Sequence, residues 1–146
     1  MALKRMDNIE IIVEDLDAVI AFFTGLGMEL EGTARVEGAW AARLVGLDDQ
    51  TVDIAMLKTP DGSGRVELAR YVSPEPVRSL PVNAPPHTLG IRRIMFAVDD
   101  IDETIDRMRD LGAELVGEVV QFEDVHRLCY LRGPEGILVA LAEDLR

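Results

Sequence analysis

The chain has 146 residues, 48% of them hydrophobic, which fits one compact folded unit or two small modules that share a core. Its 15 Lys and Arg residues against 27 Asp and Glu residues give a formal net charge of −12, which disfavours nucleic acid and anionic membranes as partners. The sequence has no apolar run that could span a bilayer, no signal-peptide pattern and a single cysteine, Cys129, so we expect a cytoplasmic protein without an internal disulfide.

The most informative feature of the sequence is an internal duplication. When the chain is shifted by 85 residues, Val13–Gly32 falls on Val98–Gly117, and 9 of the 20 positions are identical. Further on, "TPDG" at Thr59–Gly62 matches "GPEG" at Gly133–Gly136 with an offset of 74. The offset becomes smaller because the first copy carries about 11 extra residues around "VEGAWAARLVG".

Each copy predicts the element order β-α-β-β-β. An alternation of apolar residues from Ile9 to Val13 predicts the first strand, and residues 91–98 repeat it. Asp15 and Asp100 are predicted helix N-caps, the second in a capping box with Glu103. The two helices are predicted to end at Gly27 and Gly112 in the left-handed conformation. Their predicted apolar stripes are Leu16, Val19, Ile20 and Phe23, and Ile101, Ile105, Met108 and Leu111.

The prolines suggest how the copies are joined. Five of the 7 prolines lie between Pro74 and Pro86, which predicts an extended linker. We therefore expect a first module over residues 1–72 with a Trp40-containing insertion, a proline-rich linker over 73–90 and a second module over 91–146. Together they are expected to make one structural domain built by duplication.

Tandem βαβββ modules with the pattern V-x-D-ϕ-D after the first strand resemble the vicinal oxygen chelate superfamily. This superfamily includes glyoxalase I, extradiol dioxygenases and bleomycin-resistance proteins. The matching stretches are "IEIIVEDLDAVIAFFTGLGMEL", "RVEL", "IMFAVDDIDETIDRMRDLGAEL" and "RGPEGILVAL". The resemblance implies an α+β fold with curved mixed sheets around a central cavity, and a homodimer.

The resemblance also implies where a metal ion would bind. Metal-binding members place one ligand on the first and one on the last strand of each module, and the matching positions here are Asn8, Glu67, Arg93 and Ala140. Only Glu67 is a usual metal ligand, because Ala140 has no donor atom and Arg93 brings a permanent positive charge. We therefore expect a degenerate metal site without a metal ion or another cofactor.

The turn around Pro134 decides which residues of the last hairpin face the cavity. A three-residue loop, with a type I turn and Gly136 in the left-handed region, puts Tyr130 opposite Ala140, and His126 on the same face. A two-residue loop would put Cys129 there instead. With the three-residue loop, the candidate ligand-binding residues are Asn8, Glu10, Trp40, Met56, Met95 and Tyr130. Cys129 is then a core residue.

Three residues are candidates for catalysis: Glu67, Arg93 and His126. Arg93 can replace the charge of the metal and keep Glu67 ionised, within one chain or across a dimer, and it can also bind a carboxylate or phosphate of a ligand. Alternatively, the two form a structural ion pair. His126 can act as a general acid or base, or it is an ordinary strand residue.

Two functions follow from this reading. The first is binding of a small organic molecule without a metal, as in the bleomycin-resistance branch, whose members hold a cationic drug in an acidic groove. The alternative is a metal-independent, glyoxalase-like lyase or isomerase with Glu67 as base and Arg93 as charge stabiliser. A structural or regulatory partner without a ligand is a third possibility. The expected partners are a small molecule and a second copy of the chain.

Overall fold

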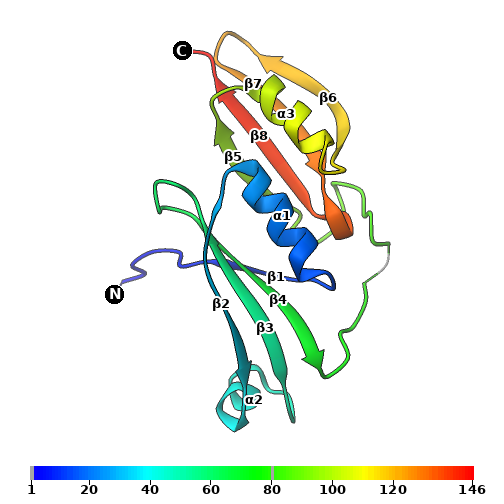
Figure 1. The fold of residues 1–146 in the computed structure, drawn as a ribbon. Coiled ribbons are helices and arrows are strands. Elements are labelled where there is room, and N and C mark those ends of the chain that lie inside the picture. Colours follow the sequence, from blue (N-terminus) through cyan, green and yellow to red (C-terminus); the bar gives the residue numbers. More distant parts are fainter. Residues whose placement is uncertain (1, 80) are drawn as a thin grey trace. The chain divides into compact units, whose positions relative to one another are not determined.

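The computed structural model describes residues 2–79 and 81–146. The order of its elements is β-α-β-β-β in both copies, with one additional helix in the first copy (Figure 1). The chain divides into two compact units, Met1–Arg78 and Ser79–Arg146, called unit 1 and unit 2 below. Each unit has its own sheet and its own long helix, so each can be described by itself.

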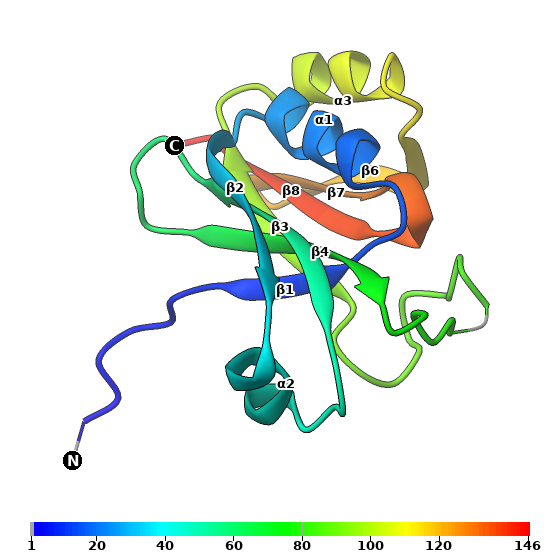
Figure 2. The same cartoon turned by 60° about the horizontal axis from the view of Figure 1, so that its bottom comes forward.

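Unit 1 is a mixed sheet covered by a helix. Its sheet has the strand order β1-β4-β3-β2, with β1 parallel to β4 and the other pairs antiparallel. Helix α1 lies across this sheet (Figures 1 and 2). The elements are β1 (Ile9–Ile12), α1 (Leu16–Leu26), β2 (Glu29–Glu37), α2 (Ala39–Val45), β3 (Thr51–Lys58) and β4 (Arg65–Ser73).

Unit 2 repeats this arrangement without the additional helix. Its sheet has the order β5-β8-β7-β6, with β5 parallel to β8. The elements are β5 (Arg93–Val98), α3 (Ile101–Arg109), β6 (Glu114–Phe122), β7 (His126–Arg132), the 3₁₀ turn η1 (Pro134–Gly136) and β8 (Leu138–Asp144). The predicted α+β class with two tandem βαβββ modules is confirmed.

The predicted helix ends are also found. The carboxylate of Asp15 accepts a hydrogen bond from the Ala18 N–H at 3.0 Å, and Asp100 caps the N–H of Glu103 at 3.1 Å. The Glu103 side chain does not complete the capping box that we expected, because its carboxylate pairs with Arg107 one turn further along α3.

Both helices close with the same Schellman motif. The N–H of Met28 donates to the Phe23 carbonyl and that of Ala113 to the Met108 carbonyl, each at 3.0 Å. The residues before these donors are Gly27 and Gly112, with φ of 122° and 89°, as the sequence predicted. Leu111 was wrongly placed in the apolar stripe of α3. Its side chain is 45% exposed because regular helix ends at Arg109.

The core of each unit lies between its helix and its sheet. Phe22 and Phe23 of α1 make an edge-to-face contact with centroids 5.2 Å apart, although only Phe23 had been predicted in the stripe. Alternate strand residues are buried on the same side, namely Ala55, Leu57, Val66 and Leu68 in unit 1 and Cys129, Leu131, Val139 and Leu141 in unit 2. The expected core position of Cys129 is confirmed. We call the opposite side of each sheet its open face.

The last hairpin has the predicted three-residue loop. The Gly133 N–H donates to the Ile137 carbonyl at 2.7 Å, and Tyr130 lies opposite Ala140. The turn is not type I, however, because Glu135 is left-handed (φ 57°) as well as Gly136 (φ 78°). Only glycine fits at position 136, since a Cβ there would lie 2.0 Å from the Val82 carbonyl oxygen.

The insertion in the first copy forms helix α2, between β2 and β3 at the end of their hairpin (Figures 1 and 2). Ala41 and Ala42 are buried, whereas the Trp40 side chain is 58% exposed. The strands β2 and β6 both contain a register shift, between Leu30 and Gly32 and between Val116 and Val120. None of the helices in the described part of the chain has the length and apolarity needed to cross a membrane.

Candidate functional site

A row of four residues crosses the open face of unit 1. Glu10 on β1 is the register partner of Glu67 on β4, which is opposite Met56 on β3, and Met56 is opposite Gly32 on β2. Register partners on neighbouring strands point to the same face, so the side chains of this row lie next to one another. The register therefore brings together three predicted ligand or catalytic residues: Glu10, Met56 and Glu67.

The two carboxylates in this row influence each other. Partial burial and the charge of Glu67 raise the pKa of Glu10 above its usual range. Tyr71, four residues after Glu67 on the same face, donates a hydrogen bond to Gln50 Oε1 at 3.3 Å. Burial and the charge of Glu10 raise the pKa of Tyr71 as well. Tyr71 and Gln50 were not predicted as site residues, although alternation along β4 from Glu67 leads to Tyr71.

The equivalent row in unit 2 has different chemistry. Met95 on β5 is opposite Ala140 on β8, which is opposite Tyr130 on β7, and Tyr130 is opposite Val116 on β6. By the offsets of the duplication, Met95, Ala140 and Tyr130 replace Glu10, Glu67 and Met56. The acidic row of unit 1 is thus matched by an apolar and aromatic row.

Arg93 lies beside this row and is held by Tyr130. The Arg93 Nε donates to the Tyr130 hydroxyl at 2.7 Å, and the guanidinium carbon lies 5.8 Å from the ring centroid. Within residues 2–79 and 81–146, the two terminal nitrogens of Arg93 make no hydrogen bond or ion pair. This leaves an oriented fork of N–H donors, which is the arrangement that binds a carboxylate or phosphate.

Other predicted residues are not brought into these rows. His126 is on the same face as Tyr130 but four residues away along β7, or about 13 Å at the usual strand rise. The helix of Trp40 joins β3 near Thr51, which is five residues, or about 16 Å, from Met56. Asn8 comes just before β1 and is exposed. Glu67 and Arg93 belong to different units, so their pairing stays a prediction.

The positions that the resemblance implies for a metal ion carry one usual ligand, Glu67. The residues beside Glu67 on its row are Glu10 and Met56, and the other positions implied by the resemblance hold Asn8, Arg93 and Ala140. In the part of the chain that the structure describes, no three His, Cys, Asp or Glu side chains are grouped so that they could hold a metal. A guanidinium and a methyl group cannot replace imidazole or carboxylate ligands.

A cavity of about 860 Å³ is found on the other side of the unit 1 sheet, not on its open face. It lies between the N-terminal turn of α1 and the strands β2, β3 and β4. None of the predicted site residues lines it. It is therefore separate from the two rows of the open faces.

Comparison with known proteins agrees with this fold. A family model described as the glyoxalase/bleomycin resistance protein/dioxygenase superfamily matches residues 7–130. Because this match covers most of the chain, the protein belongs to that superfamily. A search of curated proteins gives no significant match.

Several solved structures are similar to the chain. A glyoxalase family protein from Bacillus cereus has 54% sequence identity and a TM-score of 0.95, over 100% of this chain and 97% of that one. A fosfomycin resistance protein from Listeria monocytogenes, in complex with Mn(II) and a dihydroxypropylphosphonic acid, has 16% sequence identity and a TM-score of 0.63. The match covers 96% of this chain and 90% of that one. An antibiotic-binding protein from a Streptomyces species has 16% identity and a TM-score of 0.60, over 99% and 98%.

Proposed function

We propose that the protein binds a small organic molecule on the open faces of its sheets without a metal ion. The observation that carries this proposal is the oriented guanidinium of Arg93, at a position that the family resemblance implies for a metal ligand. Tyr130 fixes Nε at 2.7 Å and so directs the two terminal nitrogens away from the hydroxyl. A permanent positive charge at such a position can take over the role of a cation in holding an anionic group.

The chemistry of Arg93 indicates the kind of ligand. A planar fork of N–H donors binds carboxylates, phosphates and phosphonates with two parallel hydrogen bonds. Met95 and Tyr130 beside it offer apolar and aromatic surface for the rest of the molecule. The phosphonic acid bound by the Listeria protein and the antibiotic bound by the Streptomyces protein support a small organic ligand by analogy of fold alone.

Calorimetric titration tests this proposal. Propylphosphonate, inorganic phosphate and benzoate are titrated into the metal-free protein with chelator present. We expect at least one probe to bind with a dissociation constant on the order of 1 mM or tighter, and Arg93→Gln to weaken this binding about tenfold. Arg109→Gln, at the exposed end of α3, is the matched control and should bind as the natural protein does. Absence of heat with every probe, or unchanged binding by Arg93→Gln, would contradict the proposal.

A second candidate function is a metal-independent lyase or isomerase with Glu67 as base and Arg93 as charge stabiliser. The observation that favours it is the raised pKa of Glu10 beside Glu67. Two neighbouring carboxyls of which one takes up a proton readily are suited to proton abstraction next to a carbonyl. On this basis Glu10 shares the role of Glu67.

Proton exchange tests this second candidate. 2-Oxobutanoate in D₂O is followed by NMR, and we expect the protein to speed deuterium uptake next to the carbonyl. Glu67→Gln and Glu10→Gln should each slow it about a hundredfold, within the usual contribution of a general base. Exchange equal to that without protein, or unaffected by Glu67→Gln, would exclude this mechanism for 2-oxo acids.

We further propose that the protein is a homodimer in the cytoplasm. Supporting observations are the family membership and the single buried Cys129, which needs no oxidising compartment. Sedimentation velocity at micromolar concentration should give a species of about 32 kDa, twice the 16.1 kDa of the chain. A single species of monomer mass at these concentrations would argue against the dimer.

A further inference from the structure

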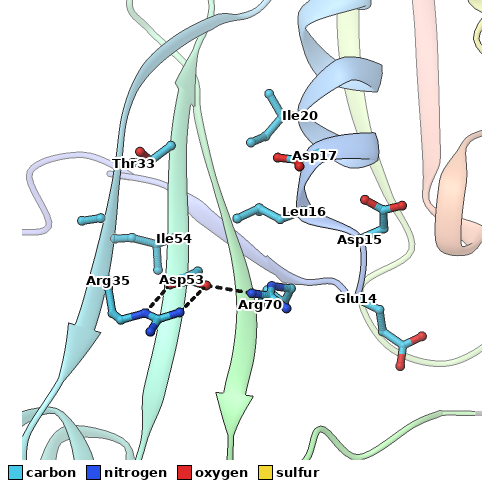
Figure 3. Close-up of a pocket in the computed structure, with 11 residues that line it drawn as sticks. Glu14, Asp15, Leu16, Asp17, Ile20, Thr33, Arg35, Asp53, Ile54 and Arg70 are labelled. Carbon is cyan, nitrogen blue, oxygen red and sulfur yellow. Dashed lines mark hydrogen bonds and ion pairs between the residues drawn. The ribbon is translucent and has the colours of Figure 1, made fainter.

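The cavity of unit 1 is a groove between α1 and the helix side of the sheet (Figure 3). On the sheet side, Asp53 on β3 holds two arginines. Arg35 on β2 donates Nε and Nη2 to its two carboxylate oxygens at 2.8 and 3.0 Å, and Arg70 on β4 donates Nη2 at 2.9 Å. On the helix side, Leu16, Asp17 and Ile20 face these strands (Figure 3). The groove is therefore lined by charges of both signs with apolar side chains between them.

Both guanidinium groups keep donors for a ligand. Each guanidinium has five N–H bonds; Arg35 uses two of them on Asp53 and Arg70 uses one. In the described part of the chain, Asp53 is the hydrogen-bond partner of both and neither has another. Hydrogen bonds from Arg35 lower the pKa of Asp53 to about 2, so this residue stays ionised and keeps both arginines in place.

The carboxylates on the helix side of the groove differ in whether they already have an ion-pair or hydrogen-bond partner. Glu14 pairs with Arg78, and Asp15 caps the Ala18 N–H. Asp17 makes no ion pair or hydrogen bond through its carboxylate within residues 2–79 and 81–146. Asp17 is therefore the acidic group of the groove that is available to a ligand.

In unit 2, side chains of the sheet bind the start of the helix at the equivalent position. There, Arg127 binds the carboxylate of Asp102 with two hydrogen bonds of 2.8 and 3.1 Å. Next to it, the Glu143 carboxylate accepts the N–H of Ile101, the first residue of α3, at 2.7 Å. A cation and an anion on neighbouring strands thus tie the start of the helix to the sheet.

Unit 1 has the opposite charges at these two strand positions. The duplication places Asp53 where unit 2 has Arg127, and Arg70 where it has Glu143, and each pair is in register across two strands. The helix positions remain the same, since Asp17 matches Asp102 and Leu16 matches Ile101. Asp53 cannot pair with Asp17, and Arg70 cannot accept the Leu16 N–H. The bridges that close unit 2 are therefore not possible in unit 1.

We propose that this groove is a binding site for a free α-amino acid with an aliphatic side chain. The ammonium group of the ligand lies between Asp53 and Asp17, where unit 2 has the guanidinium of Arg127. The carboxylate lies between Arg70 and the Leu16 N–H, where unit 2 has the carboxylate of Glu143. The aliphatic side chain packs on Leu16 and Ile20. The ligand thus makes the two contacts between the strands and the start of the helix that Arg127 and Glu143 make in unit 2.

Two arguments favour a zwitterion over a simple anion. The groove has more acidic than basic residues, so a free anion meets local repulsion that a neutral zwitterion avoids. The required charges are also close together, because register partners on antiparallel strands lie about 5 Å apart between Cα atoms. An α-amino acid has its two charges at a similarly short separation. The volume of about 860 Å³ is within the range of small-molecule sites.

NMR titration of the ¹⁵N-labelled protein with each of the common L-amino acids tests this site. We expect L-leucine, L-isoleucine or L-valine to shift the amide signals of Leu16 and its neighbours, with a dissociation constant on the order of 1 mM or tighter. N-acetyl-L-leucine lacks the ammonium and L-leucine amide lacks the carboxylate. Both should bind at least about tenfold more weakly, because each leaves one pair of charged partners unsatisfied.

Variants locate the binding. Asp17→Asn and Arg70→Gln should each weaken it about tenfold, whereas Asp53→Arg combined with Arg70→Glu should abolish it by restoring the bridges of unit 2. The matched control is Arg65→Gln, on the same strand as Arg70 but on the open face, where Arg65 pairs with Glu31 at 2.8 Å. If a strand variant fails to fold, Asp17→Asn still tests the proposal, because Asp17 is exposed and its substitution should not disturb the fold. Absence of saturable shifts with every amino acid, tight binding of N-acetyl-L-leucine, or unchanged binding by Asp17→Asn would overturn the proposal.

Discussion

The two units share one backbone plan but carry different charges at matching positions. On the open face, the acidic pair Glu10 and Glu67 of unit 1 corresponds to Met95 and Ala140 of unit 2. On the helix side, two ion-pairing strand residues have exchanged sign between the units. The strand order, the pairing of the first strand with the last and the helix N-caps are the same in both. The duplicated fold is therefore kept by its core and its caps, which leaves the polar positions free to diverge.

Truncation of the shared core should affect both units equally and most strongly. Leu68 and Leu141 occupy equivalent positions, and both are completely buried. We expect Leu68→Ala and Leu141→Ala to lower the free energy of unfolding by about 3 kcal/mol each, through lost apolar contact and a residual cavity. Urea denaturation followed by circular dichroism measures this. Losses that differ by more than about twofold would show that the cores of the two copies are not equivalent.

Removal of the Glu143 carboxylate should lower the free energy of unfolding more than the matched change in unit 1 does. Glu143→Ala leaves the Ile101 N–H without its acceptor, and we expect a loss of about 1.5 kcal/mol. The matched change in unit 1, Arg70→Ala, removes one partly exposed ion pair and should cost about 0.5 kcal/mol. Thermal unfolding at neutral pH compares the two. Equal losses would mean that Glu143 does not stabilise the start of α3.

Low pH should remove the contribution of the ionised Asp53 to the free energy of unfolding. Its pKa is lowered from 3.8 to about 2 by the hydrogen bonds from Arg35, so the folded state favours the ionised form. The stabilisation is fully present above pH 4 and is lost as the pH falls towards 2. We expect Asp53→Asn to be about 1 kcal/mol less stable at pH 7, after allowance for solvent screening, and to approach the stability of the natural protein as the pH falls through the folded-state pKa of about 2. A difference that does not change with pH would contradict this origin.

Glu10 should show the opposite pH dependence and the smallest effect. Its pKa is raised, so ionisation at neutral pH destabilises the folded state. Glu10→Gln should therefore increase stability by about 0.5 kcal/mol at pH 7, after screening by solvent, and the gain should disappear below the usual pKa of a glutamate. Met95→Gln at the matching position of unit 2 is the control and should show no pH-dependent change. Denaturant titrations at pH 3 to 8 measure both.

Much of the fold could be predicted from the sequence because it depends on local signals. The duplication, the caps Asp15 and Asp100, and the closing Gly27 and Gly112 are all fixed by residue type and spacing. The loop length at Pro134 set the register that brings Tyr130 opposite Ala140. The end of regular helix in α3 could not be predicted, because Leu111 continues the apolar period into the closing turn.

The sites were predictable only in part. Alternation along the strands was enough to bring Glu10, Met56 and Glu67 onto one face. It could not show that Tyr130 holds Arg93, since this contact depends on side-chain conformations. The groove of unit 1 was missed, although a signal was present in the sequence. The duplication aligns Asp53 with Arg127, and this exchange of sign is visible once the later strands of the two copies are compared.

The register shifts in β2 and β6 have a consequence for solution behaviour. Both strands lie at one end of their sheets, where unpaired backbone groups could recruit a strand of another molecule. Each shift falls next to a glycine that the duplication conserves, Gly32 or Gly117, and it interrupts the regular ladder there. Irregular edges of this kind are poor templates for amyloid-like growth. Both halves of the chain therefore carry an interrupted ladder in the strand that ends their sheet, and such interruptions disfavour the addition of a further strand.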